Sequence, residues 1–168
     1  MLGLEKGKIT LVQYSEDWPK AYEAEKAFLQ SILADRLVEI YHTGSTSIPG
    51  MAAKPIIDIL AGVRSLCDLG ELQNLLASCG YLPTDLVDNP YHKIFSKGNP
   101  VTHHLHVVEG SGLEKSSHPG FRDRLIQDAI LAREYLELKR ELAKKFPNDA
   151  DAYARGKNFW ISRRLPTT

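Results

Sequence analysis

The residues best suited to chemistry form a short polar loop between two apolar stretches. The loop reads His-Thr-Gly-Ser-Thr-Ser over residues 42–47. Gly44 permits a left-handed turn or a close approach of the backbone to a ligand. Backbone N–H groups and the hydroxyls of Ser45 and Ser47 would line a concave surface that suits phosphate oxygens. The same hydroxyls can instead satisfy an ordinary turn, which composition alone favours, and no Gly-Lys-Ser/Thr sequence of a Walker loop follows.

A single carboxylate interrupts the apolar stretch after this loop. Asp58 lies within Pro-Ile-Ile-Asp-Ile-Leu-Ala, residues 55–61. An ionised carboxylate in a buried strand is costly unless it meets a cation, a metal ion or several hydrogen-bond donors. Alternation places Ile56, Asp58 and Leu60 on one face of such a strand. Asp58 is therefore either a metal ligand or an acceptor for backbone amides of the loop.

A third polar feature is the sequence Thr-His-His-Leu-His over residues 102–106. On a strand, His104 and His106 share one face and His103 lies on the other. Two histidines at this spacing can hold one divalent metal ion, bind phosphate or simply pack. Polar groups on core strands need a partner, so the histidines together with Asp58 predict a polar site.

Hydrophobic periodicity and turn residues place these groups on or beside strands. Strands are predicted over residues 37–41 and 55–63, and a hairpin over 91–108 turns at Gly98-Asn99. Residues 9–14 are expected to form a short strand or an extended arm, and 43–50 and 110–119 to form loops. Helices are predicted from Ser15 or Asp17 to residue 32, over 68–79, from Phe121, from Asp128 to residue 146, and over about 153–164. A mixed sheet followed by helices indicates an α+β fold.

The last helices carry a clear apolar stripe. Its members repeat every three or four residues and are Leu131, Tyr135, Leu138, Leu142 and Phe146. We expect this stripe to pack onto the sheet. The basic pairs Lys139-Arg140 and Lys144-Lys145 are expected on the exposed face of a helix, and Trp18 and Trp160 in the core.

Length and composition indicate one domain of ordinary size. The chain has 168 residues, which we expect to form a single domain over 1–168, with a sheet-containing core at about 9–110 and C-terminal helices at about 118–165. Lysine plus arginine and aspartate plus glutamate number 21 each, so bulk charge gives no long-range attraction to nucleic acid or membrane, although a local patch could still provide one.

No membrane span and no signal peptide are expected. The apolar runs are shorter than the roughly 20 residues that a span needs, which predicts a cytoplasmic protein without a membrane partner. Cys67 and Cys79 lack a metal-binding spacing and are expected as reduced, partly buried thiols. Oligomeric state is not indicated.

Several motifs together resemble one known family. The sequence of residues 42–59, from the polar loop through Asp58, closely resembles the signature of the GrpB family. Further matching motifs are Leu-Val-Gln-Tyr at 11–14, Trp-Pro at 18–19, residues 102–108, Phe-Arg-Asp at 121–123, Ala-Arg-Glu-Tyr at 132–135, Leu-Lys at 138–139 and Phe-Pro at 146–147. The resemblance spans about residues 9–160.

The resemblance implies the nucleotidyltransferase-like superfamily, which has the fold of DNA polymerase beta. It implies a mixed β-sheet packed with helices and a helical C-terminal part. In that superfamily, a Gly-Ser or Gly-Gly turn holds nucleotide phosphates, and Asp-x-Asp or Asp-x-Glu on a strand holds metal ions with a third, neighbouring carboxylate. Gly44 and Ser45 match the turn and Asp58 the first carboxylate, but Leu60 occupies the second carboxylate position.

The departure from the superfamily pattern affects the expected metal. The strand of residues 104–106 offers histidines where a third carboxylate would stand, and Glu109 is the nearest acid. Two Mg²⁺ ions prefer oxygen ligands, whereas one aspartate with histidines suits Zn²⁺ or Mn²⁺ better. A divalent metal (Mg²⁺, Mn²⁺ or Zn²⁺) is therefore expected at Asp58, His104 and His106.

Two kinds of function remain open at this point. One is a divergent metal-dependent nucleotidyl- or phosphoryl-transferase that acts on a small phosphorylated substrate, with Asp58 as the catalytic residue. Its phosphate- or nucleotide-binding residues would be Gly44, Ser45, Ser47, Lys54 and Arg122. The alternative is a non-catalytic module that binds a nucleotide or phosphate, or a partner domain like those fused behind dephospho-CoA kinase in relatives.

Overall fold

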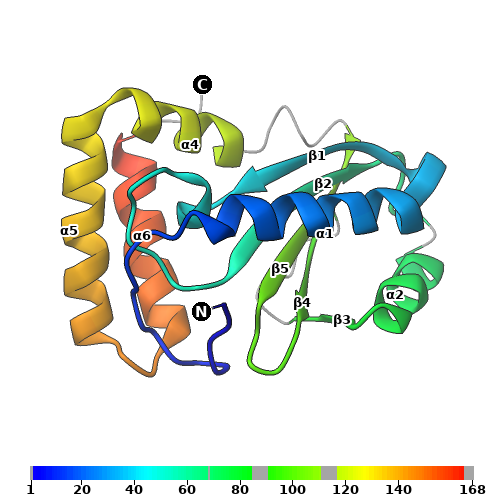
Figure 1. Ribbon diagram of the computed structural model, residues 1–168, viewed down its shortest axis with the longest axis horizontal. Helices are drawn as coiled ribbons and strands as arrows, with labels where there is room; N and C mark the ends of the chain where they lie inside the picture. Colours follow the sequence, from blue (N-terminus) through cyan, green and yellow to red (C-terminus); the bar gives the residue numbers. More distant parts are fainter. Residues whose placement is uncertain (1, 68, 85–90, 111–116, 165–168) are drawn as a thin grey trace.

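The computed structural model describes residues 2–67, 69–84, 91–110 and 117–164 (Figure 1). Its strands are β1 (Leu37–Thr43), β2 (Ile57–Val63), β3 (Tyr81–Pro83), β4 (His92–Lys97) and β5 (His103–Glu109). Its α-helices are α1 (Asp17–Leu33), α2 (Leu69–Ser78), α4 (Ser117–Gln127), α5 (Ala129–Lys145) and α6 (Ala150–Arg164). Two 3-10 turns, η1 (Ala34–Arg36) and η2 (Ser45–Ser47), flank β1.

One mixed sheet joins the strands in the order β1-β2-β5-β4-β3. β2 and β5 run parallel, and the other neighbouring pairs are antiparallel. The parallel register sets Asp58 beside His104 and Leu60 beside His106. The predicted mixed sheet followed by helices is confirmed, and the sheet places the predicted polar residues on adjacent strands.

The two faces of the central strands differ in character. Ile57, Ile59 and Leu105 have no exposed surface and pack in one cluster with Leu29 and Leu33 of α1. Figure 1 shows α1 lying across this face of the sheet. Because side chains alternate along a strand, Asp58, His104 and His106 lie on the opposite face. Burial of the apolar face therefore fixes which way these polar side chains are directed.

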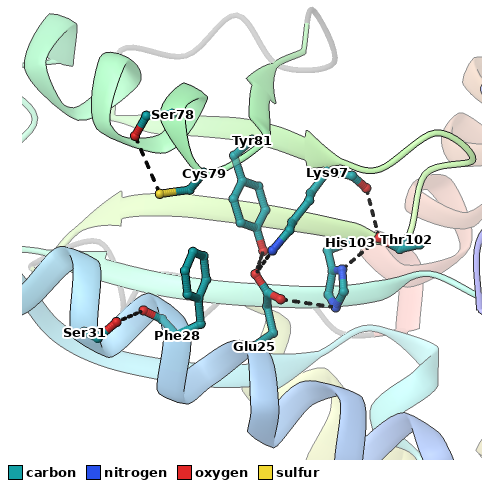
Figure 2. A network of polar contacts seen from close by, with 9 residues as sticks. All are labelled: Glu25, Phe28, Ser31, Ser78, Cys79, Tyr81, Lys97, Thr102 and His103. Carbon is teal, nitrogen blue, oxygen red and sulfur yellow. Dashed lines mark hydrogen bonds and ion pairs between the residues drawn. The ribbon is translucent and has the colours of Figure 1, made fainter.

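A cluster of polar residues also ties α1 to the strands on the α1 side (Figure 2). The Glu25 carboxylate accepts hydrogen bonds from Tyr81 Oη at 3.0 Å and from Lys97 Nζ at 2.7 Å. The Lys97 ammonium also lies 4.7 Å from the centre of the Phe28 ring. Together with His103, we call Glu25, Tyr81 and Lys97 the Glu25 cluster. It connects α1 to β3, β4 and β5.

His103 is held in this cluster by one ring nitrogen. The Thr102 hydroxyl donates to the Lys97 carbonyl at 3.1 Å, so it must accept the 2.9 Å hydrogen bond from His103 Nδ1. This assigns the hydrogen to Nδ1 in neutral His103 and leaves a lone pair on Nε2. That buried Nε2 has no hydrogen-bond partner among the described residues and lies 4.0 Å from Glu25 Oε2.

A second apolar cluster joins the loop after β1 to the last helices. Ile48 and Met51 of the loop are buried against Leu125, Leu131 and Tyr135 of α4 and α5. Partly buried residues around them include Leu138 and Trp160. Figure 1 shows α5 and α6 side by side at one end of the sheet. The predicted stripe thus packs largely against the loop and α6 rather than flat on the sheet.

Local signals explain several element boundaries. Asp128 caps α5, since its carboxylate accepts from the N–H groups of Ile130 at 3.1 Å and Leu131 at 2.9 Å. α5 ends at Lys145, one residue before its predicted end and two residues before Pro147. The short edge strand β3 was not predicted, because three residues are too few to show alternation.

Three further sequence-based expectations differ from the structure. The loop expected up to residue 119 is wrong at its end, because α4 already begins at Ser117. Cys67 is exposed rather than partly buried, although both cysteines are free as expected. Lys139 was expected on an exposed helix face but is only 1% exposed, because the segment around Ala52 covers it. In the described part of the chain, no helix is both long enough and apolar enough to cross a membrane.

Candidate functional site

The turn after β1 closely approaches Asp58. Gly44 has φ +68°, a left-handed conformation that side chains other than glycine rarely adopt. A Cβ atom at Gly44 would lie 2.3 Å from Asp58 Oδ2 and 2.9 Å from Asp58 Cβ. Thr43 pairs with Asp58 across β1 and β2, which sets this approach. Conformation and space therefore both require glycine at position 44.

Most hydroxyls of the loop stabilise the turn itself. The Ser47 hydroxyl donates to the Gly44 carbonyl at 2.6 Å, and the Thr43 hydroxyl donates to the Asp58 carbonyl at 3.3 Å. Thr46 Oγ1 shares a 3.1 Å hydrogen bond with His42 Nε2. Ser45 instead interacts with the hydroxyl of Tyr135 on α5. Ser47 would thus have to release the Gly44 carbonyl before donating to a phosphate.

His42 belongs to the opposite side of the sheet. Its ring stacks on Tyr22 of α1 with 4.6 Å between ring centres, and it is 8% exposed. Burial, reinforced by the charge of Arg122, outweighs the effect of Asp58 and lowers the pKa of His42 to about 4. His42 is therefore neutral near pH 7 and acts in packing.

Asp58 and His104 form the central polar pair. His104 Nδ1 lies 3.2 Å from Asp58 Oδ1, and since a carboxylate only accepts, His104 Nδ1 is the donor. Burial raises the pKa of Asp58. The hydrogen bond and charge of His104, with the charges of His106 and Lys54, outweigh burial and hold the pKa well below its ordinary value. Asp58 is thus a carboxylate at any physiological pH, and its side chain keeps 28% of its surface exposed.

His106 lies on the same face, one alternation further along β5. Its Nδ1 shares a 3.1 Å hydrogen bond with Nε2 of His92 on β4. Within the described residues, no three His, Cys, Asp or Glu side chains are grouped closely enough to hold a metal ion. The structure thus brings Asp58, His104 and His106 onto one face without assembling a ready-made metal centre.

Two lysines and a tyrosine border Asp58 on the side of the helices. The Nζ atoms of Lys54 and Lys157 lie 5.9 Å and 4.9 Å from the centre of the same Tyr153 ring. Burial and repulsion from Lys54 lower the pKa of Lys157 to about 8, although the charge of Asp58 acts in the opposite direction. Burial raises the pKa of the Tyr153 hydroxyl, and the charge of Asp58 contributes to the rise. The surroundings of Asp58 thus contain more positive than negative charge.

Lys139 of α5 holds the chain segment around Ala52 by a buried hydrogen bond. Its Nζ donates to the Ala52 carbonyl at 2.6 Å and lies 5.2 Å from the centre of the Tyr135 ring. Burial and repulsion from Lys157 and Arg140 lower the pKa of Lys139 to about 7. Sequence reasoning missed both Lys139 and Tyr153. The available signal was that Lys139 falls four residues after Tyr135, in phase with the apolar stripe.

Arg122 has structural partners on the free edge of β1. It donates to the His42 carbonyl at 2.9 Å and pairs with Asp123 at 2.6 Å. The Tyr22 hydroxyl donates to the Ile40 carbonyl at 3.3 Å on the same strand. A depression of about 450 Å³ lies between α1 and β1, but none of the predicted site residues lines it. Arg122 therefore has a structural role at the edge of β1, whereas Lys54 and Lys157 border Asp58.

Comparison with known proteins assigns the chain to a family. The model of the family described as GrpB protein matches residues 8–166. This chain is a member of the GrpB family. It is 39% identical to the glutamate-rich protein GrpB of Alkalihalophilus pseudofirmus, over 98% of both chains. It is also 27% identical to a dephospho-CoA kinase of Mycolicibacterium paratuberculosis, over 94% of this chain and 45% of that protein.

Solved structures confirm the fold. The structure of the conserved protein GrpB from Enterococcus faecalis matches with a TM-score of 0.79 and 28% identity, covering 92% of this chain and 99% of that chain. The Cid1 poly(U) polymerase with Mg 3'-dATP bound matches with a TM-score of 0.56 and 16% identity, covering 86% of this chain and 49% of that chain. At this identity, the second match shows a nucleotidyltransferase-like fold and no more.

Proposed function

We propose that this chain binds the phosphate groups of a nucleotide or another small phosphorylated compound beside Asp58. The observation that carries this proposal is the close approach of Gly44 to Asp58, with only 2.3 Å available for a Cβ atom. A glycine backbone in a left-handed turn brings N–H groups close to a ligand, as phosphate-binding turns require. Ser45, next to Gly44 in the chain, adds a hydroxyl, and Lys54, whose charge acts on Asp58, adds a cation. The nucleotidyltransferase-like fold supports this assignment.

The first candidate activity is a divergent metal-dependent nucleotidyl- or phosphoryl-transferase. Asp58 would be its catalytic residue, and a single divalent ion would be held by Asp58, His104 and His106. Since Nδ1 of His104 already donates to Asp58, such an ion would use Nε2 of that residue. One carboxylate with two imidazoles suits Zn²⁺ or Mn²⁺ better than Mg²⁺. When bound, the ion would polarise a phosphoryl oxygen.

An arrangement with two metal ions does not fit these residues. Leu60 occupies the position of the second carboxylate and has no exposed surface. This observation favours the second candidate function, a binding module without catalysis. The dephospho-CoA kinase relative has a similar domain as 45% of a longer chain, which supports a role as a partner domain.

A thermal-shift experiment tests the proposal and separates the candidates. The wild type and Asp58→Asn are melted with nucleotides and phosphorylated metabolites, with and without Mg²⁺, Mn²⁺ or Zn²⁺. A ligand at a hundredfold excess over its dissociation constant should stabilise the fold by about 2.7 kcal/mol. Turnover that requires metal and Asp58 would support the transferase, and binding without turnover the module. Absence of stabilisation by every phosphorylated compound would refute phosphate binding.

A further inference from the structure

The positive charges near Asp58 are not matched by carboxylates at contact distance. Lys54 and Lys157 approach one tyrosine ring, and within the described residues neither has a carboxylate oxygen within 4.0 Å. Asp58 carries one negative charge and is paired directly with His104. Two ammonium groups held this close repel each other unless an anion lies between or beside them. The region is therefore suited to an added anion.

Few side chains are available at the same place to hold the metal ions that would normally attract phosphate. Leu60 supplies no oxygen, and Nδ1 of both His104 and His106 is already engaged. The charge that metal ions would contribute is here carried by lysine side chains. We propose that Lys54 and Lys157 bind a polyphosphate group, such as pyrophosphate or the triphosphate of a nucleotide, without a divalent metal ion. This inference rests on the proposed phosphate-binding function and specifies what balances the ligand's charge.

The surrounding hydroxyls suit the same ligand. Tyr135 and Tyr153 are 3% and 2% exposed, and both come from the helices that border Asp58. Burial raises the pKa of each, so both stay protonated and able to donate. Ser45 adjoins Tyr135. A polyphosphate offers several charged acceptor oxygens, which matches two ammonium groups together with several hydroxyl donors.

Calorimetric titration with pyrophosphate in the presence of a chelator tests this inference. The wild type should bind pyrophosphate in EDTA. Lys157→Met and Lys54→Met should each lower the affinity roughly tenfold to a hundredfold, the range for a hydrogen bond to a charged group. Lys144→Met is the matched control, because Lys144 is exposed on α5 and should leave binding unchanged. Lys157→Arg keeps the charge and should retain most of the affinity.

The outcomes separate this inference from the proposed function. If pyrophosphate binds only after Mg²⁺ or Mn²⁺ is added, metal-free binding is wrong while phosphate binding stands. If Lys157→Met melts like the wild type and binds as tightly, the role of Lys157 is wrong. If neither pyrophosphate nor any nucleotide binds under either condition, the proposed function fails and this inference with it.

Discussion

Two partly buried carboxylates lie on opposite faces of the same sheet, and their partners differ. Glu25 receives Lys97 at 2.7 Å and Tyr81 at 3.0 Å (Figure 2). Among the described residues, the Asp58 carboxylate has one direct partner, His104 at 3.2 Å, and the charges of His106 and Lys54 act on it over longer distances. The histidines of the two groups, His103 and His104, are consecutive in β5 and point to opposite faces.

This difference separates a structural role from a binding role. The charge of Glu25 is neutralised at contact distance, so the Glu25 cluster has little to gain from a ligand and mainly holds α1 on the strands. Around Asp58 the lysines repel one another, and the backbone approaches so closely that only glycine fits. A charged group left without a direct partner keeps its attraction for an added ion.

The largest effect is expected from a side chain at the turn. Gly44→Ala places a methyl group 2.3 Å from Asp58 Oδ2 in a left-handed conformation. Backbone strain of about 1–2 kcal/mol and overpacking of about 1–3 kcal/mol should together lower the free energy of unfolding by roughly 2–5 kcal/mol. Pyrophosphate binding should also be lost. Urea unfolding and calorimetry measure both effects.

Gly50 provides the matched control for this substitution. It also has a positive φ, +75°, but a Cβ atom there meets nothing within 4 Å. Gly50→Ala should therefore show the backbone strain alone, about 1–2 kcal/mol, with binding intact. Equal losses of stability in the two variants would mean that the contact with Asp58 contributes nothing.

Removing the carboxylate charge on each face should affect stability and binding differently. Glu25→Gln leaves Lys97 without its carboxylate and should cost about 2–3 kcal/mol, because Lys97 remains 27% exposed and is partly solvated. Asp58→Asn keeps an acceptor for His104 and should cost less than about 1 kcal/mol. In EDTA, Asp58→Asn should bind pyrophosphate several-fold more tightly, since a repelling charge is gone, while Glu25→Gln binds unchanged. Weaker binding by Asp58→Asn in EDTA would contradict the charge argument.

Much of the Asp58 face could be predicted from the sequence, because alternation is a local property. The period of two residues in β2 and β5 predicts that Asp58, His104 and His106 share a face and that His103 does not. The left-handed turn at Gly44 and the helix cap at Asp128 also follow from local rules. The resemblance to the GrpB family added the nucleotidyltransferase-like fold.

The Glu25 cluster could not be predicted in this way. Its contacts join residues 56 and 72 positions apart, and the hydrogen bond from Lys139 to Ala52 spans 87 positions. Periodicity shows which side of an element is apolar but not which other element covers it. For the same reason, Lys139 was assigned to an exposed face although another segment covers it.

The single-domain assignment stays a prediction that the two cores can test. The Asp58 face depends on α5 and α6, whereas the Glu25 cluster is built from α1 and strands. Leu138→Ala, in the partly buried layer of the second core, should cost about 2 kcal/mol. Trp18 reports the first core and Trp160 the second. With Trp160→Phe and Trp18→Phe as single-tryptophan backgrounds, both probes should show the same unfolding midpoint, and separate midpoints would indicate two units.

A smaller effect concerns the pH dependence of stability. Lys139 has a pKa of about 7 in the folded chain, against an ordinary lysine pKa of 10.5. Between these values the unfolded chain holds a proton that the folded chain has lost, so stability should rise with pH. The slope is at most about 1.4 kcal/mol per pH unit. Lys157, whose pKa is lowered to about 8, adds a rise of the same sign above pH 8. Lys139→Met should therefore flatten the rise in urea unfolding measured between pH 7 and 8, and the exposed Lys144→Met should not.

The smallest effect on the free energy of unfolding is expected at His103 and His104, the consecutive histidines that point to opposite faces of the sheet. In His103→Gln, the side-chain amide can place an N–H donor where His103 Nε2 presents a lone pair 4.0 Å from Glu25 Oε2. It also loses the bond from Nδ1 to Thr102, and since each hydrogen bond is worth about 1 kcal/mol net, stability should change by less than about 1 kcal/mol.

His104→Gln is the matched variant on the other face. It removes the donor to Asp58, so the response to added divalent ions should change while stability again shifts by less than about 1 kcal/mol. Melting both variants with and without Mn²⁺ compares the two positions directly. A loss above about 2 kcal/mol in His103→Gln would show that the Glu25 cluster needs the imidazole itself. If the two variants responded identically to Mn²⁺, Asp58 would not differ from Glu25 in its ability to accept a further ion.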